Sequence, residues 1–319
     1  MATWRNSAGN MIYADMQDIL REVKMKFNRK LCIVVALLML ISTAMAFGAC
    51  SSDSEDTDVA EPDTEANEGV DNSLQEILDR GEFILGCDDE FPPMGFDDNG
   101  EIVGFDIDLA TAVMERIGVS LTVKPIDWKA KEMELSSGNI DAIWNGYTIT
   151  ADRNEQVQFT KPYLSNEQML VVKADSDITS KADLAGKVVG AQVESAAEDL
   201  VNEDEEFANS LSELRVYDSY QDALNDLKSS DRVAAVAVDK ILIEWVMVQS
   251  PDTFKTLDES LGTEYFGIGL RKGSVALADA IDEALDDMKA DGTTAEISSN
   301  WFGEDIVIRD VPRLTAADF

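Results

Sequence analysis

The sequence of 319 residues contains no histidine. This absence excludes His-based metal sites, Ser-His-Asp triads and Cys-His pairs together. Cysteine is also rare, because only Cys32, Cys50 and Cys87 are present and none of them belongs to a CxxC pair. The sequence therefore offers neither a cysteine zinc site nor a redox pair, and we expect no metal and no cofactor.

Basic residues are scarce beside acidic ones. The chain has 26 Lys and Arg against 63 Asp and Glu, which gives a formal net charge of −37. Such a surface repels nucleic acid and anionic lipid head groups, so DNA and RNA are excluded as partners. We interpret the charge as that of a highly soluble, self-repelling exported protein. The alternative is an acidic surface that attracts cationic ligands.

Only one long apolar run is present, and it lies near the N-terminus. Lys26, Arg29 and Lys30 precede the run, which extends from Leu31 to Phe47 and is followed by two small residues and Cys50. This order is typical of a signal peptide. A run of about 17 apolar or small residues is short for a membrane span, which needs roughly 20. The alternative is an uncleaved membrane anchor.

Cys50 stands where a bacterial lipobox has its lipidated cysteine. The segment resembles a lipoprotein signal peptide over residues 25–49, although Phe47 replaces the usual leucine. The resemblance implies an exported protein with a lipid anchor on Cys50 at the outer face of the cytoplasmic membrane. Residues 1–24 contain three acidic side chains, which signal peptides do not normally begin with. We therefore interpret them as a misassigned extension and Met25 as the start.

Residues 50–73 are rich in Ser, Asp, Glu and Thr and have almost nothing to bury, which predicts a disordered acidic tether. The 49 residues before Cys50 hold six of the basic and three of the acidic side chains, so the remainder has 20 basic and 60 acidic ones and a formal charge of about −40. With Cys50 lipidated, Cys87 is the only thiol left, and no internal disulfide can form.

The length exceeds what one small core needs and suits two lobes. From Leu74 on, short apolar segments alternate with amphipathic ones, which is typical of an α/β protein. We expect strands over residues 83–87, 121–126, 140–143, 188–191, 214–217, 233–238 and 266–270, and helices over 106–117, 128–137, from 195 on, around 223–227 and over 277–288. Gly118 is expected to end the first long helix. Open α/β sheets bind ligands beyond the carboxyl ends of their strands.

One loop that follows such a strand carries a set of polar groups. The segment DAIWNGYTITADRNEQVQFTKPY at 141–163 contains Asn145, Gly146 and Thr148, and Arg153 follows five residues after that threonine. The loop offers backbone N–H groups, a hydroxyl and a guanidinium close together. Arginine clamps a carboxylate through two parallel hydrogen bonds.

Two other segments, FPPMGFDDNGEIVGFDIDLA at 91–110 and DGTTAEISSNWFGEDI at 291–306, complete a pattern over roughly residues 74–308. The pattern closely resembles the polar amino-acid family of extracellular solute-binding proteins, the ligand-capturing subunits of ABC importers. The resemblance implies a two-lobed periplasmic-binding-protein-like fold of type II, α/β in class, with a helix-flanked sheet in each lobe. The implied segments are residues 74–164 and 265–310 for lobe 1, 165–264 for lobe 2, 311–319 for a C-terminal tail, and Leu164–Val171 and Glu264–Leu270 for two crossing hinge segments.

The resemblance also implies which residues bind an amino acid. The carboxylate would be bound by Arg153, by the N–H of Thr148 and by the backbone at Ser195 and Ala196, where a helix N-terminus favours anions. The alternative for Arg153 is a surface arginine. The ammonium group would be bound by Asp239, with the Thr148 hydroxyl and the Gly146 carbonyl as further candidates. The alternative for Asp239 is a helix N-cap.

The ligand side chain would lie against Phe91 and Trp128, near Asp88 and Asn145. The alternative for the aromatic residues is a place in the core. One position departs from the family pattern, because Glu194 stands where glycine usually precedes the lobe 2 helix. A carboxylate there should weaken the binding of acidic ligands. Neutral polar, sulfur-containing and cationic amino acids remain open.

We therefore predict a monomeric, non-enzymatic receptor that binds a free amino acid and delivers it to an ABC permease by hinge closure. One alternative is a dehydratase-like enzyme, since the same fold hosts enzymes acting on precursors of aromatic amino acids. The absence of histidine and of an evident acid/base pair speaks against it. The other alternative is a sensor domain that presents amino acids to a signalling partner.

Overall fold

The computed structural model describes residues 71–319. The predicted signal peptide, Cys50 and the tether up to residue 70 lie outside this range. The tether was expected to reach residue 73, but helix α2 (Ser73–Arg80) already begins there. Ser73 is buried, and its hydroxyl accepts a hydrogen bond from the N–H of Leu277, at 3.1 Å, in a helix from the other end of the chain.

The first lobe combines segments from both ends of the described chain. Its strands are β1 (Glu82–Cys87), β5 (Ser120–Pro125), β6 (Ala142–Ile143), β7 (Val157–Phe159) and β13 (Gly269–Arg271). Its helices are α2, the 3-10 turn η1 (Trp128–Ala130), α3 (Phe105–Ile117), α4 (Lys131–Ser136), α5 (Ala151–Gln156), α10 (Val275–Asp291) and α11 (Thr293–Phe302). The sheet order is β5-β1-β6-β13-β7, so the late strand β13 lies between two early ones. A small second sheet joins β2 (Glu90–Phe91), β3 (Gly95–Asp98) and β4 (Glu101–Val103).

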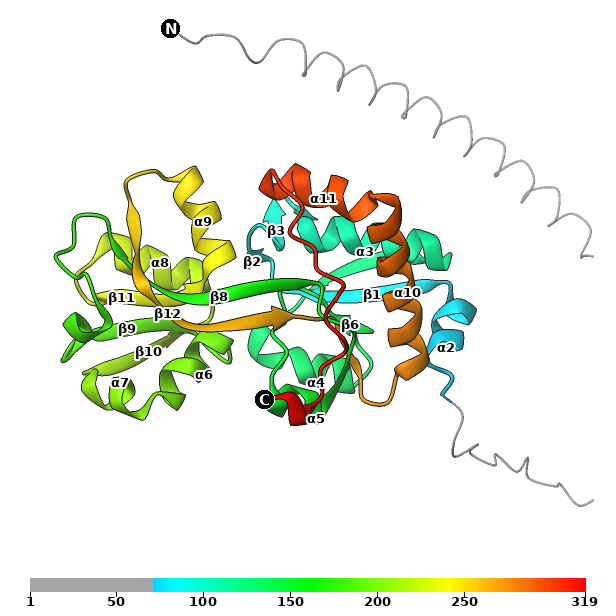
Figure 1. The fold of residues 1–319 in the computed structure, drawn as a ribbon, viewed down its shortest axis with the longest axis horizontal. Coiled ribbons are helices and arrows are strands. Elements are labelled where there is room, and N and C mark those ends of the chain that lie inside the picture. The colour runs from blue at the N-terminus through cyan, green and yellow to red at the C-terminus, as the bar shows by residue number, and fades with distance from the viewer. Residues whose placement is uncertain (1–70) are drawn as a thin grey trace, which may run out of the picture. The chain divides into compact units, whose positions relative to one another are not determined.

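The second lobe is continuous in sequence. Its strands are β8 (Leu164–Lys173), β9 (Val188–Gln192), β10 (Glu213–Tyr217), β11 (Ala235–Asp239) and β12 (Phe254–Phe266), in the order β10-β9-β11-β8-β12. Its helices are α6 (Ala196–Glu203), α7 (Glu205–Ser210), α8 (Tyr220–Ser229) and α9 (Lys240–Gln249), with the 3-10 turn η2 (Lys181–Leu184). Helices α8 and α9 cover one side of the sheet and α6 and α7 the other (Figure 1). Every residue of β11 is consequently buried, as in a parallel strand covered on both faces.

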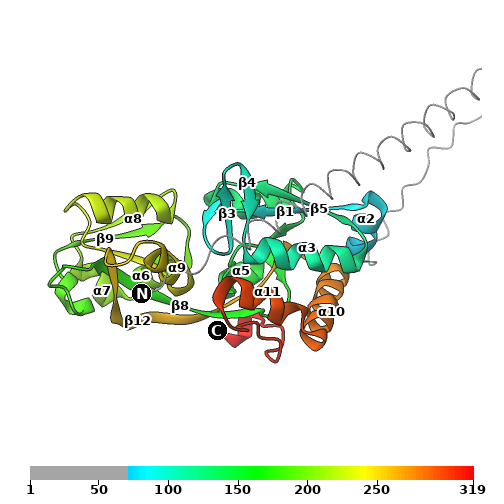
Figure 2. The same ribbon diagram turned by 90° about the horizontal axis from the view of Figure 1, so that it is seen from above.

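Two long antiparallel strands connect the lobes. Strands β8 and β12 are paired along most of their length and run from one lobe to the other, as both views show (Figure 1, Figure 2). The register shifts near Ser260, where the ladder is irregular. The predicted two-lobed α/β fold with two crossing segments is confirmed.

Most predicted elements form for the expected reasons. In α3 the apolar face is buried, and Gly118 adopts a left-handed conformation with φ 91° and donates its N–H to Met114 at 2.9 Å. The single strand predicted over 266–270 is wrong. Strand β12 ends at Phe266 and β13 begins at Gly269, because the N–H of Gly267 bonds to Tyr147 and the chain changes from the lobe 2 ladder to the lobe 1 sheet.

Helices α9 and α11, the strand β7 and the small three-stranded sheet were not predicted. Helix α9 reads KILIEWVMVQ and has apolar residues on every side, so it shows no clear helical period. The 3-10 turn η3 (Ala316–Asp318) packs near α5. The segment that precedes η3 contains Arg309, which attaches it to α10 through a 2.9 Å ion pair with Asp282.

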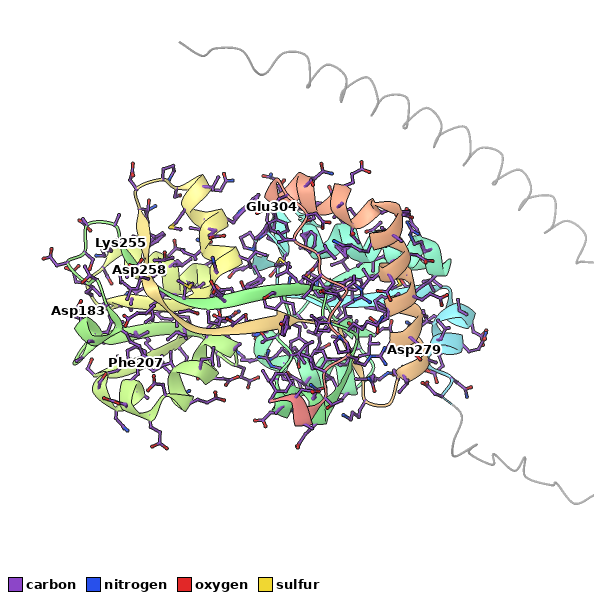
Figure 3. All side chains as sticks on the ribbon, viewed as in Figure 1. Asp183, Phe207, Lys255, Asp258, Asp279 and Glu304 are labelled. Atoms are coloured by element: carbon purple, nitrogen blue, oxygen red, sulfur yellow. The ribbon has the colours of Figure 1, made fainter. Side chains whose placement is uncertain are left out.

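The acidic surface covers both lobes. Figure 3 marks exposed carboxylates at Asp183 and Asp258 on lobe 2 and at Asp279 and Glu304 on lobe 1. None of the helices within residues 71–319 is long and apolar enough to cross a membrane.

Candidate functional site

A small cavity lies between the two lobes. The lining contains every residue predicted to bind the ligand, namely Asp88, Phe91, Trp128, Asn145, Gly146, Thr148, Arg153, Ser195, Ala196 and Asp239. Three lining residues were not predicted, Gln168, Gln192 and Tyr220. Gln192 ends strand β9, so the rule of the carboxyl ends of strands could have found it.

Arg153 provides the positive end of the cavity. Thr150 caps α5 by accepting the N–H of Arg153 at 3.2 Å, and this fixes the start of the helix. The guanidinium is buried, donates to the carbonyl oxygens of Thr148 and Glu194 at 3.0 Å each, and lies 4.8 Å from the Tyr147 ring centroid. No carboxylate among residues 71–319 lies within ion-pair distance of it. Carbonyl dipoles and an aromatic face leave the charge uncompensated, so this end can receive an anion.

Helix α6 approaches the same end from lobe 2. Ser195 is its N-cap and accepts the N–H of Glu198 at 3.1 Å. Ala196 is buried at the first position of the helix, where unpaired N–H groups favour negative charge. The predicted anion-binding groups of both lobes therefore converge.

Lys131 is a buried cation that the sequence reasoning missed. Its ammonium group lies 5.0 Å from the Trp128 ring centroid and 3.5 Å from the Glu194 carboxylate. It also donates to the Glu194 carbonyl at 3.3 Å. Burial lowers the pKa of Lys131, and the neighbouring Arg153 lowers it further. The only sequence signal was its place at the start of a short helix after Trp128.

Glu194 has a backbone conformation that glycine favours. Its φ is 55°, in the left-handed region where glycine is favoured. Its carbonyl accepts hydrogen bonds from both Arg153 and Lys131, while its side chain is about half exposed and lies outside the small cavity. The backbone of Glu194 thus joins the lobes, and its carboxylate lies at a neighbouring groove that Lys131 and Asp199 also line.

Asp239 provides the negative end of the cavity. It is the last residue of β11 and stands at the N-cap position of α9, yet its side chain makes no capping bond. Instead its carboxylate accepts hydrogen bonds from the amides of Asn166 at 2.9 Å and Gln168 at 2.7 Å. Burial, and then the nearby Glu264, raise the pKa of Asp239 well above its usual value. The N-cap alternative is therefore excluded by geometry.

Asp88 and its neighbours form the remaining wall. The Asp88 carboxylate accepts the side-chain amide of Gln192 at 2.7 Å, and the N–H of Asp88 bonds to Asn145 at 3.2 Å. Burial raises the pKa of Asp88 to about 6. The Phe91 and Tyr220 rings lie 5.9 Å apart across the lobes. This part of the cavity combines a buried carboxyl group with aromatic surface, and both can contact the polar side chain of a ligand.

Asp106 supports the loop that contains Gly146. Its fully buried carboxylate accepts the N–H of Gly146 at 2.8 Å and the hydroxyl of Tyr163 at 2.9 Å. Burial raises the pKa of Asp106 to about 7. Gly146 itself has φ 58°, and a Cβ there would lie 2.8 Å from the Phe91 ring. Only glycine lets the loop approach Phe91 this closely.

Further contacts join the lobes on both sides of the cavity. On one side, the Trp245 ring of α9 lies 6.1 Å from Phe96 and 6.0 Å from Trp301, which both belong to lobe 1. On the other, Lys129 and Asp218 form a 3.0 Å ion pair between exposed groups. Interlobe contacts thus flank the cavity on two sides.

Comparisons with known proteins find a family model and relatives that match most of this chain. The family model of bacterial extracellular solute-binding proteins, family 3, matches residues 83–304. The L-cystine-binding protein TcyJ of Escherichia coli (strain K12) is 30% identical over 244 residues, which cover 76% of this chain and 89% of that protein. ABC transporter arginine-binding protein 1 of the same organism is 32% identical over 223 residues, 68% of this chain and 89% of that protein.

Solved structures are also similar to this chain. A substrate-binding protein of an ABC uptake transporter from Streptococcus pneumoniae, with bound histidine, has a TM-score of 0.72 and 38% sequence identity. The match covers 74% of this chain and 98% of that one.

Proposed function

The chain belongs to family 3 of the bacterial extracellular solute-binding proteins, and we propose that it binds a free polar amino acid in its interlobe cavity and delivers it to an ABC permease. The relatives are amino-acid-binding proteins of ABC transporters. Their ligands differ. The amino acid that this chain binds must therefore be identified from its own site and by measurement.

One observation carries the proposal. Among the described residues, a single cavity contains a buried guanidinium of lobe 1 without a carboxylate partner and a buried carboxylate of lobe 2 without a cationic partner. The first matches the carboxylate of an α-amino acid and the second matches its ammonium group. Asp88, Phe91, Trp128 and Asn145 are then left for the side chain.

A binding screen tests this function. We expect the unfolding temperature to rise with at least one amino acid in a panel that includes L-arginine, L-histidine, L-glutamine and L-cystine, because a ligand that binds only the folded state stabilises it. A turnover assay with prephenate-like acids separates binding from dehydratase activity. No shift with any amino acid, or measurable turnover, would count against the proposal.

The binding cycle rests on hinge closure about β8 and β12. Lobe 1 (74–164 and 265–310) and lobe 2 (165–264) each contribute groups to the cavity, so a ligand gains all its contacts only when the lobes meet. The contacts of Glu194 with Arg153 and Lys131 support this cycle, because they join the two lobes beside the ligand carboxylate. Retrieval of the permease with the loaded protein separates transport from a sensor role.

Membrane attachment is a further part of the proposal. We infer that residues 25–49 are removed and that a lipid on Cys50 holds the exported protein, as a monomer, at the outer face of the cytoplasmic membrane. The lipobox-like sequence supports this anchor.

Replacing Cys50 with alanine removes the thiol that the lipid requires. We expect Cys50→Ala to release the protein from the membrane and to abolish labelling by a fatty-acid probe. Cys87→Ala is the matched control, since that thiol is buried and its variant should stay labelled. Unchanged labelling of Cys50→Ala would exclude this anchor.

Glu194→Gly should change both stability and selectivity. Glycine removes the strain of a left-handed residue, so the free energy of unfolding should rise by about 1 kcal/mol. It also removes the carboxylate 3.5 Å from Lys131, so acidic and neutral amino acids should bind better relative to cationic ones. Urea unfolding and calorimetric titration measure the two effects.

Glu194→Ala separates these effects. Alanine also lacks the carboxylate but keeps the strained backbone, so it should change the ligand ranking without the gain in stability. An identical ligand ranking in the wild type and both variants would mean that the exposed charge is screened and plays no part in selectivity.

A further inference from the structure

Three aromatic rings from three separate elements meet where the two lobes join. Trp245 belongs to α9 of lobe 2, whereas Phe96 belongs to β3 and Trp301 to α11 of lobe 1. The ring centroids of Trp245 lie 6.1 Å from Phe96 and 6.0 Å from Trp301, within the range of roughly 4.5–7 Å that favourable aromatic pairs adopt. In Figure 1, α9 and α11 both lie above strand β8. We call these three residues the interlobe aromatic cluster.

Each lobe holds its own part of the interlobe aromatic cluster in place. The Trp301 ring donates its Nε1–H to the Asp108 carboxylate at 2.8 Å, within lobe 1. Phe96 belongs to the ladder of the small three-stranded sheet. Trp245 extends from a helix in which residues 241–243 are buried in lobe 2. The rings are therefore preorganised, and closure brings them together at little cost in side-chain entropy.

The interlobe aromatic cluster is remote from the ligand. None of its three residues lines the cavity, so none contacts an amino acid that is bound there. All three side chains are half-buried. Opening of the lobes about β8 and β12 would separate Trp245 from both lobe 1 rings and expose apolar surface to water. This cost of opening is the same whatever ligand the cavity holds.

The other interlobe contacts differ in this respect. Lys131 and Arg153 bond to the Glu194 carbonyl beside the predicted carboxylate end of the cavity, so the charge of a ligand acts on them. The ion pair between Lys129 and Asp218 is exposed, and exposed pairs contribute little. The interlobe aromatic cluster therefore joins the lobes through contacts on which neither the ligand's charge nor the ionic strength acts directly.

We propose that Trp245 is a positioning residue that, through Phe96 and Trp301, holds the two lobes closed and strengthens the binding of every amino acid by the same factor. This inference rests on the proposed function and deepens it. The apparent dissociation constant is the intrinsic one divided by the closed fraction, so a contact that raises the closed fraction lowers every dissociation constant equally. Release requires opening, and the gain in affinity therefore lies mainly in slower dissociation.

The test is calorimetric titration of Trp245→Ala, in the full chain, with L-arginine, L-histidine, L-glutamine and L-cystine. We expect the dissociation constant of each amino acid that binds to rise roughly tenfold, because two aromatic pairs and their buried area are lost. The dissociation rates, from stopped-flow measurements, should rise by the same factor. Val248→Ala is the matched control, since Val248 also belongs to α9 and is 72% exposed. It should bind like the wild type.

A double-mutant cycle distinguishes an interlobe contact from a local packing defect. Phe96→Ala should also weaken binding. The variant with both changes should lose less affinity than the product of the two single losses, because the Trp245 and Phe96 rings act on each other. Losses that multiply would mean that the two residues act separately, and would overturn the proposal. Trp245→Leu, which keeps an apolar side chain that favours helix, replaces the alanine variant if that one does not fold.

The outcomes separate this proposal from the proposed function. A wild type that binds no amino acid of the panel overturns both. If the wild type binds and Trp245→Ala binds within twofold of it, only the role of the interlobe aromatic cluster is overturned. A loss of affinity for some amino acids and not for others would mean that the substitution distorts the cavity, and this result would also overturn the cluster's role.

Discussion

Arg153→Ala should lower the affinity for the best amino acid by at least about 30-fold while the protein stays folded. Removing one partner of a buried, hydrogen-bonded charge pair costs roughly 2–5 kcal/mol, and Arg153 is the buried cation that lines the cavity. The side chain also bridges Thr148 and the Glu194 carbonyl, so the variant loses part of the support for the closed lobes. Calorimetric titration with the panel measures the change.

The control variant should replace an arginine outside the cavity. Arg232→Ala is suitable, because the Arg232 side chain is 71% exposed and pairs with Asp226, which does not line the cavity. It should bind like the wild type. If Arg153→Ala binds its best ligand within threefold of the wild type, the carboxylate is bound elsewhere. Arg153→Lys should recover little, because an ammonium group does not reproduce the planar fork of donors.

The protein without ligand should lose stability as the pH rises from about 5 to 8. Burial raises the pKa of Asp88 to about 6 and that of Asp106 to about 7. The folded protein therefore binds more protons than the unfolded chain between pH 4 and these values, and the free energy of unfolding decreases as the protons are lost. One pKa unit corresponds to about 1.4 kcal/mol, so the total is on the order of several kcal/mol.

Carboxyl groups with lowered pKa values act in a different range. Tyr217, Arg232 and above all Ser230 hold the pKa of Asp226 at about 2. Its stabilising contribution is lost only below about pH 4, outside the range of interest. Urea unfolding at several pH values tests the prediction, with Asp106→Asn expected to flatten the profile. Stability that rises from pH 5 to 8 in the wild type would contradict it.

The sequence predicted most residues that line the cavity but missed others, among them Gln192 at the end of its own strand. Asp239 could be placed because it follows an apolar strand, and Arg153 because its segment resembles a known motif. The contact of Lys131 with the Glu194 carbonyl could not, because it forms only where the two lobes meet.

A similar limit of sequence patterns explains why a single strand was wrongly predicted over residues 266–270. The run FGIGL is apolar throughout, and periodicity cannot show that Gly267 leaves one sheet to enter another. Conversely, the conformation of Glu194 gives a physical reason why glycine is usual at that position. A left-handed backbone is what glycine normally provides there.

The position of β13 between β6 and β7 also determines the order in which the lobes can be completed. The lobe 2 sheet uses only residues 164–266, whereas the lobe 1 sheet needs residues 269–271 between β6 and β7. A chain that emerges N-terminus first can therefore close lobe 2 before lobe 1, although lobe 1 begins earlier in the sequence. Until residue 271 has emerged, β6 and β7 have no strand between them, and their unpaired edges are open to wrong partners.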